Sequence, residues 1–176
     1  MAPQTWTIDP AHSSVGFTIR HLMISKVHGH FTRWSGSLVF DEADPAASKV
    51  EVQIEVASVD TREPNRDGHL RTGDFFDVEH FPHMTFKSTR VEGSGSDFKV
   101  TGDLTLRGVT KPVVLDVEYG GQSTHPQLGP RIAFSARGVI HRKDFGVSFQ
   151  QILDTGGLAL GEKVDLVLEV QAGRAP

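Results

Sequence analysis

The sequence contains no cysteine, which excludes disulfide bonds, thiolate zinc sites and a cysteine nucleophile. It also lacks a large excess of either charge: 18 Lys and Arg residues stand against 22 Asp and Glu residues, for a formal net charge of −4. Because these charges are spread without long runs of one sign, the sequence argues against nucleic acid as a partner, which would require a basic face. Any chemistry must come from histidine, carboxylate, arginine or hydroxyl side chains.

Long apolar runs are absent too. They fall far below the roughly 20 residues that a membrane-spanning helix needs, so no transmembrane segment is expected. Residues 1–6, with the sequence MAPQTW, lack the basic and apolar segments of a secretory signal, which favours a cytoplasmic location. A length of 176 residues with 38% hydrophobic content is typical of one domain, and we expect that domain to span residues 1–176.

The dominant pattern is an alternation of apolar and polar residues, which is typical of β-strands with one buried face. Val50, Val52 and Ile54, for example, alternate with Glu51 and Gln53. Eight segments show such alternation, with apolar positions within residues 15–19, 34–40, 50–56, 84–86, 98–106, 113–117, 132–136 and 164–170. Short connections predict antiparallel neighbours. The predicted fold class is all-β, and we favour an eight-stranded antiparallel barrel over a two-sheet sandwich because closure removes exposed sheet edges.

One stretch, residues 60–81, interrupts the alternation between the third and fourth predicted strands. Cap candidates, a proline near its start and a glycine near its end predict a short helix over Asn65–Arg71, followed by a helical turn near Asp74–Val78. The three phenylalanines of this stretch are too apolar for a free loop. We therefore expect the helical insertion to pack over one mouth of the barrel as a lid or plug.

Two other function classes stay open at this point. Nine histidines are present, and His28 and His30 would share one face of an extended strand, so a His-dependent metal hydrolase is one alternative. Ligand motifs such as His-Glu-x-x-His are missing, as is the Gly-x-Ser-x-Gly motif of a serine nucleophile. We therefore expect no catalytic residues, no metal ligands and no cofactor. The second alternative is a barrel filled by its own side chains that acts as a protein-interaction module.

Several separate motifs resemble those of the YceI-like polyisoprenoid-binding proteins, in the same order. They are WTIDPAHSSVGF at residues 6–17, HLR at 69–71, DFFDV at 74–78, FPHMTF at 81–86, LTLRGVTKPV at 104–113 and RKDFGV at 142–147. The resemblance extends from about residue 6 to residue 170. It implies an eight-stranded, lipocalin-like barrel with a long apolar tunnel. It also implies binding rather than catalysis, with carriage or storage of an isoprenoid lipid such as a polyprenyl phosphate or a quinone.

A prenyl ligand agrees with simple physical expectations, because exposing its hydrocarbon tail to water costs free energy in proportion to area. By strand parity, we expect the tunnel to be lined by Phe17, Ile19, Leu38, Phe40, Val52, Ile54, Phe86, Leu104, Leu106, Leu115, Phe134, Leu166 and Leu168. A polar head group would lie at the mouth, where arginine suits phosphate because its guanidinium makes two parallel hydrogen bonds. The candidates are Arg20, His21, Arg66, His69, Arg71 and Arg142. The oligomeric state stays open, with a homodimer as one option.

Overall fold

The computed structural model describes residues 4–151 and 159–174, in which eleven strands and one α-helix are present. The strands are β1 (Gln4–Ile8), β2 (Ser14–His21), β3 (Ser25–Phe31), β4 (Trp34–Phe40), β5 (Lys49–Glu55), β6 (Val59–Asp60), β7 (His83–Ser94), β8 (Asp97–Leu106), β9 (Val109–His125), β10 (Gly129–His141) and β11 (Leu160–Gly173). The helix α1 covers Pro64–Leu70, and 3-10 helices cover Pro10–His12 (η1), Pro45–Ala47 (η2), Val56–Ser58 (η3) and Arg142–Phe145 (η4). None of the helices in these ranges has the length and apolar character that crossing a membrane requires.

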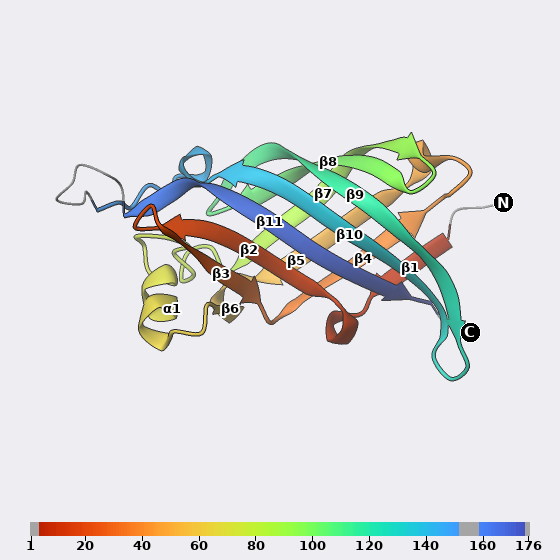
Figure 1. The fold of residues 1–176 in the computed structure, drawn as a ribbon, viewed down its shortest axis with the longest axis horizontal. Coiled ribbons are helices and arrows are strands. Elements are labelled where there is room, and N and C mark those ends of the chain that lie inside the picture. Colours follow the sequence, from red (N-terminus) through yellow and green to blue (C-terminus); the bar gives the residue numbers. More distant parts are fainter. Residues whose placement is uncertain (1–3, 152–158, 175–176) are drawn as a thin grey trace.

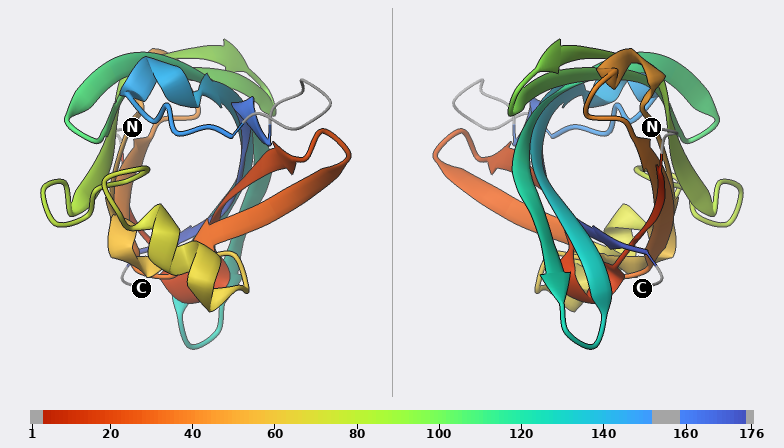
Figure 2. Two further views of the ribbon diagram at one scale, coloured as in Figure 1. Left: turned by 90° about the vertical axis from the view of Figure 1, so that its left-hand side faces the viewer. Right: turned by 90° about the vertical axis from the view of Figure 1, so that its right-hand side faces the viewer.

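The strands form one antiparallel sheet that closes on itself (Figure 1, Figure 2). The order is β1-β4-β5-β7-β8-β9-β10-β11-β2-β3-β6, and a pairing of β1 with β11 completes the ring. Both β1 and β2 lie along the same edge of β11, because Ile8 pairs with Ala172 and Phe17 pairs with Leu166. In the same way β3 is followed by β4, and β5 by β6, along shared edges. In the described chain each of these three pairs occupies one position in the ring, so eight strand positions form the barrel wall. This confirms the predicted closed, antiparallel, all-β barrel.

Three of the strands, β1, β3 and β6, were not predicted. In β3 the inward positions are Val27, Gly29 and Phe31, so a glycine hides the apolar alternation. Gly29 lies opposite Phe17 in the register, and a Cβ at this position would collide with the Phe17 ring. The close approach of the Phe17 ring therefore requires glycine at position 29. Because glycine is not an apolar side chain, the sequence pattern did not predict β3.

The predicted helix is present as α1, one residue earlier at each end than Asn65–Arg71. Pro64 occupies the first turn, where its missing N–H costs nothing, and the Glu63 side chain caps the helix by accepting hydrogen bonds from two backbone N–H groups. The helical turn expected over residues 74–78 is wrong, because this segment forms hydrogen-bonded turns. Asp77 has a φ of 51°, in the left-handed region, which a right-handed helix does not contain.

The barrel has two distinct ends. In Figure 1, α1, η4 and the turn between β2 and β3 lie at the left, and the turn between β9 and β10 lies at the right. We call the left end the helix end. The right end is called the aromatic end, for the rings described below.

Candidate functional site

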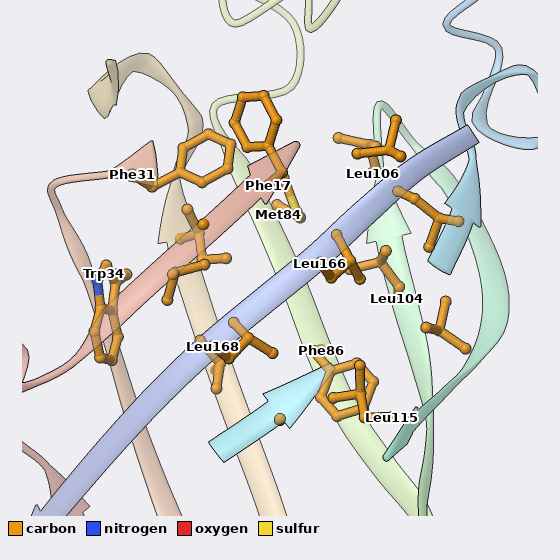
Figure 3. Close-up of a pocket in the computed structure, with 18 of the residues that line it drawn as sticks. Phe17, Phe31, Trp34, Met84, Phe86, Leu104, Leu106, Leu115, Leu166 and Leu168 are labelled. Carbon is orange, nitrogen blue, oxygen red and sulfur yellow. The ribbon is translucent and has the colours of Figure 1, made fainter. Parts of the chain in front are cut away.

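A cavity of about 630 Å³ lies inside the barrel (Figure 3). Every residue that strand parity assigned to the interior lines it: Phe17 and Ile19 on β2, Leu38 and Phe40 on β4, Val52 and Ile54 on β5, Phe86 on β7, Leu104 and Leu106 on β8, Leu115 on β9, Phe134 on β10, and Leu166 and Leu168 on β11. The cavity contradicts the alternative of a barrel filled solid by its own side chains.

The wall is apolar because each strand turns residues of one parity inward. On β8 the even-numbered residues 98–106 are buried, whereas Lys99 and Asp103 are exposed. Cross-strand pairing continues the wall from strand to strand, and Phe86 lies opposite Leu104. An enclosed hydrocarbon surface of this kind stabilises an apolar ligand by removing it from water.

Four aromatic rings gather at the end of the barrel opposite α1. Phe40 contacts Phe98 and Phe134 edge-on, with ring centroids 6.1 and 5.2 Å apart. Tyr119, the single tyrosine of the sequence, lies 5.0 Å from Phe40 and 5.3 Å from Phe134 in tilted arrangements. Burial raises the pKa of the Tyr119 hydroxyl above its ordinary value, with a smaller contribution from the charge of Glu42. These rings bound the cavity at the aromatic end, since three of them line it.

The helix end supplies polar groups to the wall. Four of the six residues predicted for a head group line the cavity, namely His21, Arg66, His69 and Arg142. Arg20 and Arg71 lie outside the lining. Arg20 is exposed on β2, and the Arg71 guanidinium donates to the carbonyls of Ala57 and Val59 at 2.9 and 3.2 Å. The structure thus gathers four of these candidates at one end of the cavity.

Arg142 is a buried cation at this end, with 3% of its surface exposed. Its Nε donates to the Gly161 carbonyl, and its Nη1 donates to the carbonyls of Val147 and Phe149, each at 2.8 Å. Its Nη2 is also buried and has no hydrogen-bond partner within the described residues. Burial lowers the pKa of the Arg142 guanidinium, and the negative charge of Glu162 opposes this effect. Within the described residues the hydrogen bonds of this buried cation go only to carbonyls, so an anionic group nearby would offset the cost of burying the charge.

His69 is held at the cavity wall by its neighbours. Its ring lies edge-on to Phe75 and to Phe149, at 5.0 and 4.9 Å between ring centroids. Its Nε2 is 2.8 Å from Oδ2 of Asp74. These contacts orient the imidazole between apolar rings and a carboxylate, so the ring forms part of the cavity wall at the helix end.

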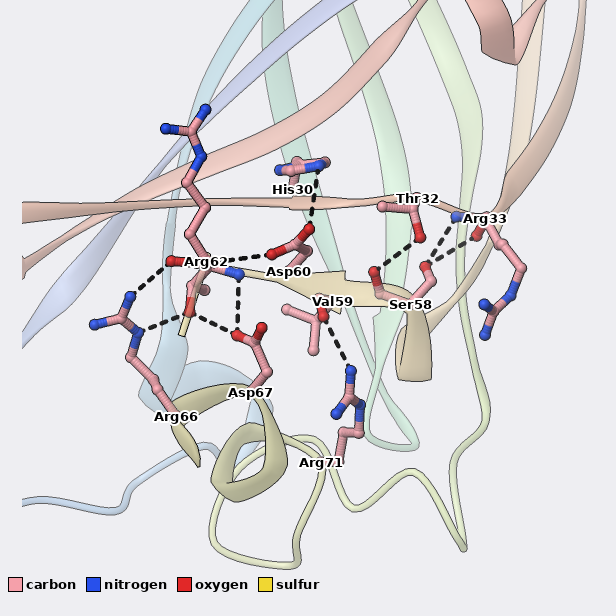
Figure 4. Close-up of polar contacts among 11 residues, drawn as sticks. His30, Thr32, Arg33, Ser58, Val59, Asp60, Arg62, Arg66, Asp67 and Arg71 are labelled. Atoms are coloured by element: carbon pink, nitrogen blue, oxygen red, sulfur yellow. Dashed lines mark hydrogen bonds and ion pairs between the residues drawn. The ribbon is translucent and has the colours of Figure 1, made fainter. Parts of the chain in front are cut away.

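A polar network fastens α1 to β6 (Figure 4). Asp67 is buried and accepts hydrogen bonds from the backbone N–H and Oγ1 of Thr61 at 2.9 and 2.6 Å. Arg66 donates to Oγ1 and to the carbonyl of Thr61, each at 2.7 Å. Arg71 adds bonds to carbonyls of η3 and β6. The network positions Arg66 at the cavity wall. It holds Arg71 against backbone carbonyls, where Arg71 stabilises the fold.

Some wall residues were not predicted. Phe31, Trp34 and Met84 lie on β3, β4 and β7 and line the cavity (Figure 3). Trp34 and Met84 share the parity of the predicted wall residues on their own strands, so extending the alternation along each strand would have found them. Phe149 lies in the irregular segment after η4, where no periodicity signals an inward side chain.

The histidine pair that suggested a metal site lies outside the cavity. His28 and His30 are exposed on β3. The Nδ1 atom of His28 is 2.9 Å from Oγ1 of Thr18, and Nε2 of His30 is 3.9 Å from Oδ2 of Asp60. Within residues 4–151 and 159–174, no three His, Cys, Asp or Glu side chains are grouped as ligands for an ion. The geometry gives the hydrolase alternative no support.

Known proteins share both sequence and architecture with this chain. The sequence matches the YceI-like domain over residues 6–172. It is 44% identical over 160 residues to Protein YceI of Escherichia coli O17:K52:H18, covering 91% of this chain and 81% of that protein. The crystal structure of a YceI protein of Campylobacter jejuni has a TM-score of 0.77 and 38% identity, covering 96% of each chain. A polyisoprenoid binding domain from Saccharophagus degradans shares the fold, with a TM-score of 0.68 and 16% identity over 97% of this chain and 98% of that one. The chain therefore belongs to the YceI-like family.

Proposed function

We propose that this protein binds the hydrocarbon chain of an isoprenoid lipid inside its barrel, as a lipocalin-like carrier or store rather than as an enzyme. The observation that carries the proposal is the apolar cavity of about 630 Å³, a volume typical of small-molecule sites. Enclosing hydrocarbon supplies about 0.8 kcal/mol per buried CH₂ before association costs. The likeness to the S. degradans polyisoprenoid binding domain supports this ligand class.

The two ends of the cavity suggest an orientation for the ligand. We place the tail toward the aromatic end and the polar head at the helix end, beside His21, Arg66, His69 and Arg142. The position of the Arg142 cation at the cavity wall supports an anionic head, such as the phosphate of a polyprenyl phosphate, over a neutral quinone ring. Arg142 contacts three carbonyls, which orient its guanidinium without neutralising its charge.

A pair of variants on β11 tests the proposal. Leu166 lines the cavity (Figure 3), whereas its neighbour Val167 does not. Leu166→Trp places an indole in the lumen, and Val167→Trp places the same ring on the outer face. Lipid-free protein is mixed with geranylgeraniol, and binding is measured by native mass spectrometry and fluorescence titration. We expect the parent to bind one molecule, Leu166→Trp to raise Kd by about tenfold or more, and Val167→Trp to leave it unchanged.

Circular dichroism and thermal melting of both variants establish that each is folded. The proposal is contradicted if the folded parent takes up neither geranylgeraniol nor its phosphate. It is also contradicted if both folded variants lose binding equally, since the lumen would then have no special part in binding.

A further inference from the structure

An apolar turn projects from the helix end of the barrel, where Leu22, Met23 and Ile24 connect β2 to β3 (Figure 1, Figure 2). These residues are 39%, 61% and 83% exposed. The other exposed large apolar residues in the described ranges stand singly in the sequence. A single exposed apolar residue is common on soluble domains, whereas adjacent exposed apolar residues favour an interaction role.

The backbone of this turn does not require these side chains. Leu22 and Met23 have φ values of 54° and 64°, both in the left-handed region. The Ile24 N–H closes the turn by donating to the His21 carbonyl at 3.2 Å. Asn and Gly are favoured at such a pair of positions, whereas side chains such as Leu and Met are strained there. Neither folding nor solubility therefore accounts for the apolar residues.

Two cations lie directly behind the turn. Arg20 and Lys26 are opposite each other in the β2–β3 register, both are exposed, and neither forms an ion pair with the part of the chain that the structure describes. Like charges in directly opposite positions destabilise a strand pair. The chain as a whole carries a formal net charge of −4, so this pair opposes the overall sign. Both features suit an anionic partner at this place.

The same hairpin forms part of the cavity wall. Ile19, His21 and Val27 line the cavity, and His21 directly precedes the turn. The Leu22 N–H donates to the carbonyl of Ala159 at 2.7 Å, and Ala159 also lines the cavity. A surface that docks on the turn therefore lies against the helix end of the cavity.

We propose that Leu22, Met23 and Ile24 dock on the surface of a bilayer that contains anionic phospholipid, with Arg20 and Lys26 against the lipid phosphates. Apolar side chains backed by cations partition into the boundary between head groups and acyl chains, and each nearby cation adds attraction to anionic lipid. In this pose the helix end of the cavity faces the bilayer. Docking uses exposed residues outside the cavity lining, so it does not depend on what the barrel binds.

Vesicles of equal parts phosphatidylcholine and phosphatidylglycerol, sedimented with the full chain at low salt, provide the test. Leu22→Asn combined with Met23→Gly installs the residues that this turn geometry favours, so the fold is kept. We expect this variant to lower the partition coefficient roughly tenfold or more. The matched control is Leu128→Asn, which removes an exposed apolar side chain from the β9–β10 turn at the opposite end and leaves partitioning unchanged.

A charge variant separates the two contributions to docking. Arg20→Gln combined with Lys26→Gln is expected to lower binding to the anionic vesicles roughly tenfold and to leave the weak binding to pure phosphatidylcholine unchanged. Uptake of geranylgeraniol from solution stays unchanged in both double variants, because none of the four residues lines the cavity. This second readout distinguishes a failure of docking from a failure of ligand binding.

A parent protein that does not sediment with anionic vesicles at low salt overturns the proposal, as does a turn variant that sediments like the parent. Analytical ultracentrifugation tests whether a second copy of this chain binds the turn instead. If the turn variant dissociates a dimer without changing vesicle binding, the turn is a contact between copies of this chain and membrane docking is rejected.

Discussion

The two ends of the barrel are built differently. The aromatic end consists of side chains on β4, β8, β9 and β10, whose rings contact each other at 5.0 to 6.1 Å. The helix end consists of α1, η4 and turns, where hydrogen bonds to the backbone hold arginines at the cavity wall. Ring contacts bound the aromatic end, whereas the helix end combines ring contacts, such as Phe75 with Phe149 at 5.2 Å, with directed hydrogen bonds. The difference teaches that one cavity is bounded by two differently built ends, with most of its polar side chains, such as Arg66 and Arg142, at the helix end.

The largest expected effect compares one phenylalanine from each end. Phe98→Ala removes a buried ring from the aromatic end and should lower the free energy of unfolding by about 3–5 kcal/mol. Phe149→Ala removes a half-buried ring beside His69 and should cost only about 1–2 kcal/mol. Urea denaturation of lipid-free protein measures both. Equal losses would break the comparison, because they would give both ends the same share of the packing.

The next effect concerns the tail. Geranylgeraniol carries one isoprene unit more than farnesol, and burying five further carbons supplies at most roughly 4 kcal/mol at about 0.8 kcal/mol for each CH₂-sized group. Ordering of the longer chain reduces this gain. We expect geranylgeraniol to bind at least about tenfold more tightly, as measured by fluorescence titration. Equal affinities for the two alcohols would show that binding to the apolar wall does not depend on tail length.

The head group should give an effect of similar size that can be measured separately. In the parent, geranylgeranyl phosphate should bind about tenfold or more tightly than geranylgeraniol, because a hydrogen bond to a charged group contributes roughly 1.5–3 kcal/mol. Arg142→Gln should bring the ratio of the two affinities close to one. The ratio is unaffected by any change in the folded fraction, since both ligands meet the same protein.

Arg71→Gln is the matched control, because Arg71 hydrogen-bonds to backbone carbonyls at the same end without lining the cavity. It should keep the parent's preference for the phosphate. A preference that survives in Arg142→Gln and disappears in Arg71→Gln would assign the head group to a different place.

The smallest effect is a shift in titration at the aromatic end. Burial raises the pKa of Tyr119 above the ordinary tyrosine value near 10, because the fold favours the neutral phenol. Its contribution to stability is therefore present below the unfolded-state pKa and is lost as the pH rises through the folded-state pKa. Tyr119 is the single tyrosine, so tyrosinate absorbance reports it alone. A folded midpoint at or below that of the urea-unfolded chain would contradict the burial.

Strand parity was enough to predict 13 of the side chains that line the cavity. A β-strand turns alternate residues to one face, so an apolar alternation such as Phe98 to Leu106 identifies inward side chains without knowledge of their partners. The eight-position barrel followed from the same signal. Parity failed where a glycine opposite a ring replaced the apolar residue, as Gly29 does in β3, and β1 and the two-residue β6 also went unpredicted.

The positions of the arginines at the helix end were less predictable, for a physical reason. Arg71 and Arg142 are both bound by carbonyls, but those carbonyls belong to segments that meet only in the folded chain. The sequence shows an arginine near a turn in each case. Nothing in the neighbouring residues shows that Arg142 lines the cavity or that Arg71 donates its hydrogen bonds to carbonyls of η3 and β6. Arg20 illustrates the same limit, since a strand-end cation faces either the lumen or solvent.

Three neighbouring strand positions in the barrel wall are each broken into two strands, and these breaks affect how sequence changes act on the barrel. The breaks between β1 and β2, between β3 and β4, and between β5 and β6 lie side by side, and Ser58 bridges two of them by accepting from the N–H groups of Thr32 and Arg33 at 3.2 and 3.0 Å (Figure 4). Each ladder restarts beyond its break, so an altered length or angle on one side does not propagate to the other. A change in β2, β3 or β6 can thus leave the register of β1, β4 and β5 unchanged.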